Sequence, residues 1–92
     1  MSDINLNSMK SFSIFKTLYE NGTASKTAKI LGITQSGVSR SLSMLENNIG
    51  FNLFIREKKG LIATPEAREL YKEVLRLTHH LEETKHSILA LL

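Results

Sequence analysis

Three glycines divide the first fifty residues into short segments, and this spacing constrains the fold more than any other feature of the sequence. Gly22, Gly32 and Gly50 each follow a run of residues with helical periodicity. Glycine tolerates the left-handed backbone conformation in which a helix often ends, so each glycine predicts a helix C-terminus. The chain therefore predicts three helices, over residues of about 6–21, 24–31 and 35–48, the last one capped by Thr34.

Each predicted helix has one apolar face. Apolar residues recur at steps of three and four, as expected for amphipathic helices that pack on one another. The faces are formed by Met9, Phe12, Phe15 and Leu18 with Tyr19 beside them, by Ala24, Ala28 and Leu31, and by Val38, Leu42, Leu45 and Ile49.

The pattern changes from helical to extended between residues 53 and 63. Two short apolar runs, 53–55 and 61–63, flank the sequence Arg-Glu-Lys-Lys-Gly at positions 56–60. Apolar runs separated by a charged, glycine-containing segment predict a two-stranded hairpin with a charged tip.

A long helix is predicted after the hairpin. Thr64, Pro65 and Glu66 supply a capping hydroxyl, a proline at the first helical position and an acid at the positive end of the helix dipole. Apolar residues then repeat as heptads, a pattern typical of a helix that pairs with another helix. The pattern is still running at Leu92, so we expect the natural chain to extend further. We expect dimerisation through Leu70, Val74, Leu77, Leu81, Ile88 and Leu91.

The order of these elements is that of a winged helix-turn-helix. Ala28, Gly32 and Val38 provide a small residue where two helices cross, a glycine at the turn and an apolar residue that holds the next helix to the core. We therefore predict a mainly α fold. A winged helix-turn-helix, with three helices plus a two-stranded wing, occupies residues 1–64, and a long linker and dimerisation helix occupies residues 65–92.

Positive charge is concentrated in the first two-thirds of the chain. The formal net charge is +3, and residues 1–63 hold eight Lys or Arg against four Asp or Glu. Residues 64–92 hold four basic and five acidic residues. This distribution favours double-stranded DNA as the partner, because its phosphates would meet the basic part of the chain.

The helix over residues 35–48 is the predicted recognition helix, with its first turns at the base edges of the major groove. Gln35 can pair with adenine and Arg40 with guanine or a phosphate, and serines permit close approach. The alternative is that these are ordinary first-turn residues on a solvated face. The predicted DNA contacts are Ser25, Thr27, Thr34, Gln35, Ser36, Ser39, Arg40, Arg56, Lys58 and Lys59.

The remaining predicted contacts lie on the hairpin and on the second helix. Arg56, Lys58 and Lys59, on a wing over about residues 53–63, can reach the minor groove or the phosphates. Ser25 and Thr27 lie where a helix that crosses the DNA backbone contacts phosphates. The alternatives are a solubilising hairpin tip and, for Ser25, a helix cap.

Other classes of function find little support. The chain has no cysteine, no apolar run of about 18 residues and a polar start, so a cytoplasmic protein without a signal peptide or membrane span is expected. His79 and His86 share a helix face, but no further ligand completes a metal site with them. No catalytic motif is present, so we expect no enzyme, metal or cofactor.

Taken together, these residues resemble the N-terminal domain of LysR-type transcriptional regulators over about residues 6–68. The most specific similarities are Gln35 with Val38-Ser39-Arg40, and Leu53-Phe54 with Arg56. Gly22-Thr23, Leu45-Glu46, Gly50 and Thr64-Pro65 are also similar to that family. The chain departs from it where Thr27 replaces an alanine, Ser36-Gly37 replaces the common Pro-Ala, and Glu66-Ala67 replaces Ala-Gly.

The resemblance implies dimers or dimers of dimers, joined through the long helix. It also implies a C-terminal domain, absent from this chain, through which a small-molecule effector would act. It assigns base and nearby phosphate contacts to Gln35, Ser36, Ser39 and Arg40, a wing contact to Arg56, and phosphate contacts to Ser25 and Thr27.

Two alternatives stay open at this point. Other winged-helix families, such as the molybdate-responsive and MarR types, share the order of elements. A protein-interaction module would instead use the heptad helix to pair with another regulator. Salt distinguishes the two functions, because DNA binding weakens steeply between about 50 and 200 mM while helix pairing changes little.

Overall fold

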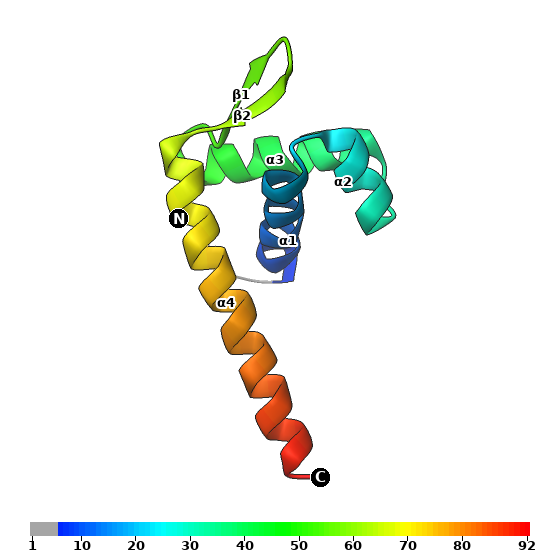
Figure 1. Ribbon diagram of the computed structural model, residues 1–92, viewed down its shortest axis with the longest axis vertical. Coiled ribbons are helices and arrows are strands. Elements are labelled where there is room, and N and C mark those ends of the chain that lie inside the picture. The colour runs from blue at the N-terminus through cyan, green and yellow to red at the C-terminus, as the bar shows by residue number, and fades with distance from the viewer. Residues whose placement is uncertain (1–5) are drawn as a thin grey trace.

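The computed structural model describes residues 6–92. Its elements confirm the predicted, mainly helical fold with a two-stranded antiparallel sheet. Figure 1 shows that α1, α2 and α3 form a compact head, from which the hairpin projects at one end and α4 at the other. The elements are α1 (Leu6–Asn21), α2 (Ala24–Leu31), α3 (Gln35–Ile49), β1 (Phe54–Glu57), β2 (Gly60–Ala63) and α4 (Pro65–Ala90).

Threonine caps set the starts of three helices. The hydroxyls of Thr23, Thr34 and Thr64 each accept the backbone N–H three residues further on, at 3.0 to 3.1 Å. This satisfies a donor that the first turn of a helix cannot use. Gly32 and Gly50 end α2 and α3 with φ of 67° and 87°, so the predicted glycine stops are confirmed.

One hydrophobic core joins the helices to the root of the hairpin. Phe15, Leu18, Val38 and Leu53 are each at most 1% exposed. The core face of α1 is shifted from the predicted one, because Ile14 is 4% exposed whereas Met9 is 36% exposed. The other core residues are Ala28, Leu45, Phe54, Ala67 and Val74.

The strands of the hairpin extend further toward its tip than the sequence predicted. Arg56 belongs to β1 and pairs with Leu61, so the turn is confined to the two lysines that follow Glu57. Ile55 and Ile62 pair directly across the strands and are both about half exposed. The basic tip therefore stands on a short, regular and largely exposed ladder.

The first turns of α4 pack on their own chain. Val74 is 4% exposed and Leu70 packs against the core, so these two predicted dimerisation residues are accounted for within the protomer. The heptad pattern alone did not reveal this, because a helix packs on its own domain and on a partner with the same periodicity. From Leu75 onward every residue of α4 is exposed.

A polar joint fixes α4 against α1. The rings of Tyr19 and Tyr71 stack with centroids 4.1 Å apart, and the Tyr71 hydroxyl donates to the carboxylate of Glu20 at 2.5 Å. Lys16 lies 3.1 Å from the same carboxylate. Tyr71 therefore links the two helices at the point where α4 leaves the head.

Candidate nucleic-acid interface

The start of α3 presents polar side chains to solvent. Gln35, Ser36, Ser39 and Arg40 are all exposed, while Val38 between them is fully buried. Burial of Val38 holds this turn firmly to the core, so the exposed side chains have a rigid base. Their short length leaves room for another surface to approach the helix closely.

Thr34 has a local role at this site. Its hydroxyl accepts the Gly37 N–H at 3.0 Å and lies 3.2 Å from the Ser36 hydroxyl. A Cβ at position 37 would approach the Thr34 hydroxyl oxygen to 3.0 Å, so glycine at this position leaves the cap undisturbed. The exposed Thr34 side chain is thus first of all the N-cap of α3.

The two candidates on α2 lie in different surroundings. Ser25 is exposed, and it is not the cap of α2, because Thr23 takes that role. Thr27 is fully buried, and its hydroxyl donates to the Thr23 carbonyl at 2.9 Å. The prediction that Thr27 contacts phosphate is therefore wrong, since the side chain faces the core and its donor is already used.

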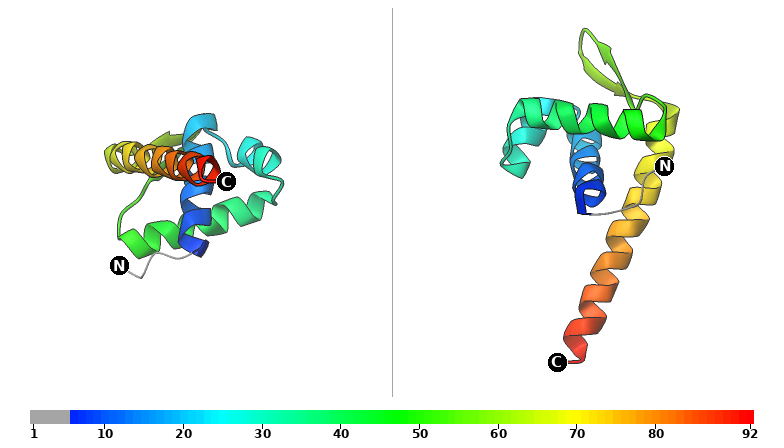
Figure 2. Two further views of the ribbon diagram at one scale, coloured as in Figure 1. Left: turned by 90° about the horizontal axis from the view of Figure 1, so that it is seen from below. Right: turned by 180° about the vertical axis from the view of Figure 1, so that it is seen from behind.

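A groove lies between α3 and the hairpin, with a volume of about 200 Å³. Ser39 of α3 and Arg56 of β1 both line it, so the fold brings together two residues that are far apart in the sequence. Lys58 and Lys59 are exposed at the tip of the hairpin, which projects beyond α3 in both views that show it from the side (Figures 1 and 2). Recognition helix and wing thus form one basic and polar surface.

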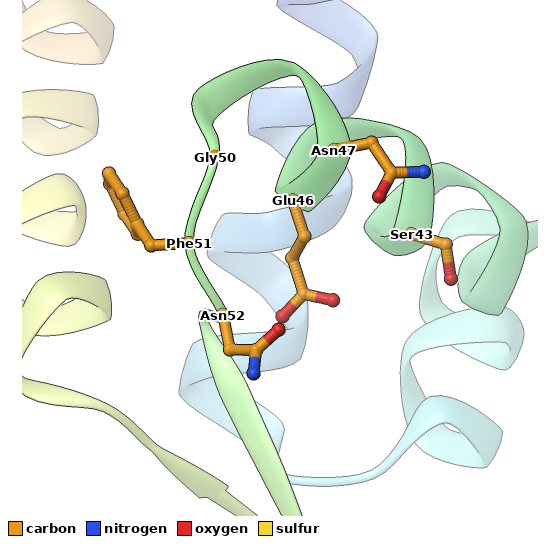
Figure 3. Close-up of a pocket in the computed structure, with 6 residues that line it drawn as sticks. All are labelled: Ser43, Glu46, Asn47, Gly50, Phe51 and Asn52. Atoms are coloured by element: carbon orange, nitrogen blue, oxygen red, sulfur yellow. The ribbon is translucent and has the colours of Figure 1, made fainter.

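Glu46 has a role at this site that the sequence did not predict. Its carboxylate oxygen accepts the backbone N–H of Leu53 at 2.6 Å and that of Phe54 at 3.3 Å. Figure 3 shows the side chain reaching from α3 to the segment that leads into β1. The signals in the sequence were an acid in the last turn of a helix, close to a glycine stop, and the similarity of Leu45-Glu46 to the LysR-type pattern.

His79 lies 2.9 Å from the carboxylate of Glu83, one turn further along α4. Within the part of the chain that the structure describes, no three His, Cys, Asp or Glu residues gather as a metal site. No helix among residues 6–92 has the length and apolar character that a membrane crossing requires.

The fold and this surface define the class of protein. A helix-turn-helix with an exposed polar recognition helix, followed by a basic hairpin, is a winged helix-turn-helix DNA-binding domain of the kind that transcription regulators carry. Residues 9–68 match the bacterial regulatory helix-turn-helix proteins of the lysR family, and the chain belongs to that family. This family consists of transcriptional regulators and is not an enzyme family.

Individual relatives agree with this assignment. The chain is 34% identical over 79 residues to the HTH-type transcriptional regulator DgcR of Pseudoalteromonas sp., a match that covers 86% of this chain and 27% of that protein. It is 36% identical over 74 residues to the HTH-type transcriptional regulator MJ0300 of Methanocaldococcus jannaschii, covering 80% and 25%. The chain thus spans about a quarter of the length of these relatives.

Solved structures show the same fold. The DNA-binding domain of BenM, in its complex with benA site 1 DNA, superposes with a TM-score of 0.86 at 23% identity, covering 91% of this chain and 98% of that one. The DNA-binding domain of CbnR, also in a DNA complex, gives a TM-score of 0.84 at 20% identity, covering 90% and 95%.

Proposed function

We propose that this chain reads double-stranded DNA in a sequence-specific manner, as the DNA-binding part of a longer transcription regulator. The observation that carries the proposal is the exposed, short and polar start of α3, held from behind by the buried Val38. Such a surface fits the major groove, which admits one α-helix. The BenM and CbnR domains with this fold were solved as complexes with DNA, which supports the same use here.

Each exposed polar residue has a role in this proposal. Gln35 and Arg40 read base edges, for which amide and guanidinium groups have suitable paired donors and acceptors. Ser25, Thr34, Ser36 and Ser39 lie close to the phosphates, and Arg56, Lys58 and Lys59 bring the wing to the minor groove or the backbone. Thr27 has no part in the contact, because it is buried.

A second copy of the chain would pair through the far part of α4. Leu77, Leu81 and Ile88 are 37%, 43% and 55% exposed, which is unusual for leucine and isoleucine along one helix face. Leu77 and Leu81 also line a groove of about 330 Å³ together with Met9 and Phe12 of α1. A partner helix in this groove would bury all of these side chains, with Leu91 extending the face.

The longer regulator supplies the rest of the proposal. The relatives are about four times as long as the part matched here, so a sensing domain for a small-molecule effector has room to follow α4. Dimers or dimers of dimers would place two or more reading heads on one DNA molecule in the cytoplasm, where bacterial DNA lies.

Selection of bound duplexes from a random DNA pool, at ~150 mM salt, tests the function directly. We expect enrichment of a two-fold symmetric motif whose half-sites lie about one helical turn apart. The absence of any enriched motif, with the protein shown to be folded and dimeric, would contradict sequence-specific reading by this chain.

The exposed apolar face of α4 supports one other function, a module that pairs with another regulator's helix and never contacts DNA. Affinity for DNA should fall steeply between ~50 and ~200 mM salt if several phosphates are contacted, whereas pairing between helices should hardly change. A chain that binds a regulator's helix but shows no salt-dependent DNA binding would favour this second function.

A further inference from the structure

Glu46 joins the recognition helix to the root of the wing through both its backbone and its side chain. Its carbonyl accepts the Gly50 N–H at 2.9 Å and so closes α3. Its carboxylate turns the other way and accepts the N–H groups of Leu53 and Phe54. A single residue therefore ends one element and holds the start of the next.

The strand ladder does not provide these bonds. Thr64 donates its N–H to the Leu53 carbonyl at 3.0 Å, which makes Phe54 and Ala63 a pair of residues without mutual hydrogen bonds. The N–H of Phe54 then points away from β2. Within the described chain no further strand lies on that side, and the Glu46 carboxylate is the acceptor there.

The hairpin has few other attachments to α3. Leu53 and Phe54 anchor its root in the core, Leu61 and Ala63 of β2 pack against the core, and β2 contacts α4. On the outer face, Ile55 and Ile62 are 51% and 53% exposed. This packing fixes where the hairpin begins, but apolar contacts are non-directional, so they set the angle of the hairpin less firmly than hydrogen bonds to α3 do.

We propose that Glu46 is a positioning residue that sets the angle of the wing relative to the recognition helix. Glu46 and Ser39 of α3 line the same groove as Arg56 of β1, so the carboxylate lies on the side of α3 that faces the hairpin. The Glu46 bonds would hold Arg56 at a set distance from the residues that read the bases. This inference rests on the proposed function, in which the wing contacts DNA while α3 reads it.

The wing angle can be measured without DNA. Residual dipolar couplings of the β1 and β2 amides, compared with those of α3, report the angle, and hydrogen exchange at Leu53 and Phe54 reports the two bonds. We expect Glu46→Ala to speed exchange at both amides and to leave the hairpin without one fixed orientation. Glu46→Gln keeps a carbonyl acceptor and should restore both. A Glu46→Ala protein whose wing keeps the native angle would overturn the proposal.

Asn47→Ala is the matched control. Asn47 is the next residue of α3 and is exposed, and Figure 3 shows its side chain pointing away from the segment that leads into β1. This change should alter neither the wing angle nor the exchange of the two amides. Native exchange protection in α1 of every variant verifies that the core is formed, which separates a positioning role from loss of folding.

DNA footprinting then tests the consequence for binding. On the selected duplex, Glu46→Ala should keep protection of the major groove and lose protection where the wing lies. It should bind at least about tenfold more weakly, because Arg56, Lys58 and Lys59 are no longer held on the DNA. Its salt slope should fall by about one for each phosphate that the wing no longer reaches. If the native wing protects no DNA, the proposed role of the wing in binding fails, while the dipolar couplings still decide the role of Glu46.

Discussion

Two residues of α2, only two positions apart, show how strongly the surroundings decide a side chain's role. Ser25 is exposed and Thr27 is fully buried, although both carry a hydroxyl and both lie near the start of the same helix. The sequence suggested similar roles because both residues are short, polar and near the start of the helix. Thr27 lies on the face of α2 that packs on the core with Ala24, Ala28 and Leu31, whereas Ser25 lies on the outer face.

Substitutions at these two positions should have opposite effects. Thr27→Val removes the hydroxyl that donates to the Thr23 carbonyl, so we expect about 1 kcal/mol lower free energy of unfolding and unchanged affinity for DNA. Ser25→Ala should leave stability nearly unchanged and weaken binding to all DNA sequences alike. Urea denaturation and fluorescence anisotropy measure the two quantities. Equal losses of affinity in both variants would contradict the buried position of Thr27.

Arg40 is the residue whose loss should most change sequence preference. It is exposed on the second turn of α3, next to Ser39. Arg40→Ala should cost about 1–3 kcal/mol in binding to the selected motif, with a smaller loss on a scrambled duplex, because the guanidinium pairs with a base in the first case only. Anisotropy titrations with the two duplexes give this difference. An equal loss on both would make Arg40 a phosphate contact.

At the scale of the elements, the joint between α1 and α4 has a titratable centre. The hydrogen bond from Tyr71 lowers the pKa of Glu20, and Lys16 adds to this effect. The same bond raises the pKa of Tyr71 to about 12. The joint is therefore held by a protonated phenol and an ionised carboxylate, and it should weaken at both ends of the pH scale.

Tyr71→Phe isolates this contribution. A carboxyl whose folded-state pKa lies below its unfolded value of about 4.3 adds stability that is present above that pH and lost as the pH falls through the folded value. We therefore expect a shallower decline of the free energy of unfolding between pH 5 and pH 3 in the variant, measured with urea. Because the Glu20 side chain is 38% exposed, solvent screening keeps the loss at pH 7 below about 1 kcal/mol.

Glu82→Gln is a suitable control for that titration, because Glu82 is exposed on the far part of α4 and belongs to none of the ion pairs among the described residues. This change should leave the decline of the free energy of unfolding between pH 5 and pH 3 the same as in the native protein. If the free energy of unfolding of Tyr71→Phe declines between pH 5 and pH 3 as steeply as that of the native protein, the joint does not cause this decline. At the alkaline end, the Tyr71 contribution is complete below pH ~10 and is lost as the pH rises through about 12.

The helices could be predicted closely from the sequence, and the wing less well. Capping threonines and glycine stops act locally, so the bounds of the helices agree with the prediction within about two residues. The strands depend on contacts between distant residues, such as the bonds from Thr64 to Leu53, which no local pattern reveals. The role of the Glu46 carboxylate could not be predicted for the same reason, since its partners lie seven and eight residues away.

At the scale of the whole molecule, α4 has two parts with different surroundings. Ala67 and Val74 belong to the core of the head, whereas every residue beyond Val74 is exposed. The heptad pattern runs through both parts. It could therefore predict that the helix packs, but it could not distinguish packing on its own domain from packing on a second chain. Leu77, Leu81, Ile88 and Leu91 are the residues left for a partner.

Leu81→Glu tests the proposed dimer. Burying an unpaired carboxylate between two apolar helix faces is unfavourable. We therefore expect dissociation to monomers at micromolar concentration, with the helical content of the head retained. Sedimentation equilibrium measures the change. His86→Glu, on the opposite side of α4, adds the same charge and should remain dimeric. If Leu81→Glu sediments as a dimer, the pairing surface lies elsewhere.

The length of α4 has a mechanical consequence. Its 26 residues span about 39 Å at 1.5 Å per residue, and the head grips only the first turns. The helix is thus a lever with its pivot at the Tyr71 joint. The far end lies about 29 Å from that pivot, so a tilt of about 10° there would swing it by about 5 Å, roughly one and a half times the rise of a base pair. A change too small to disturb the head could therefore shift the register in which two heads meet the DNA.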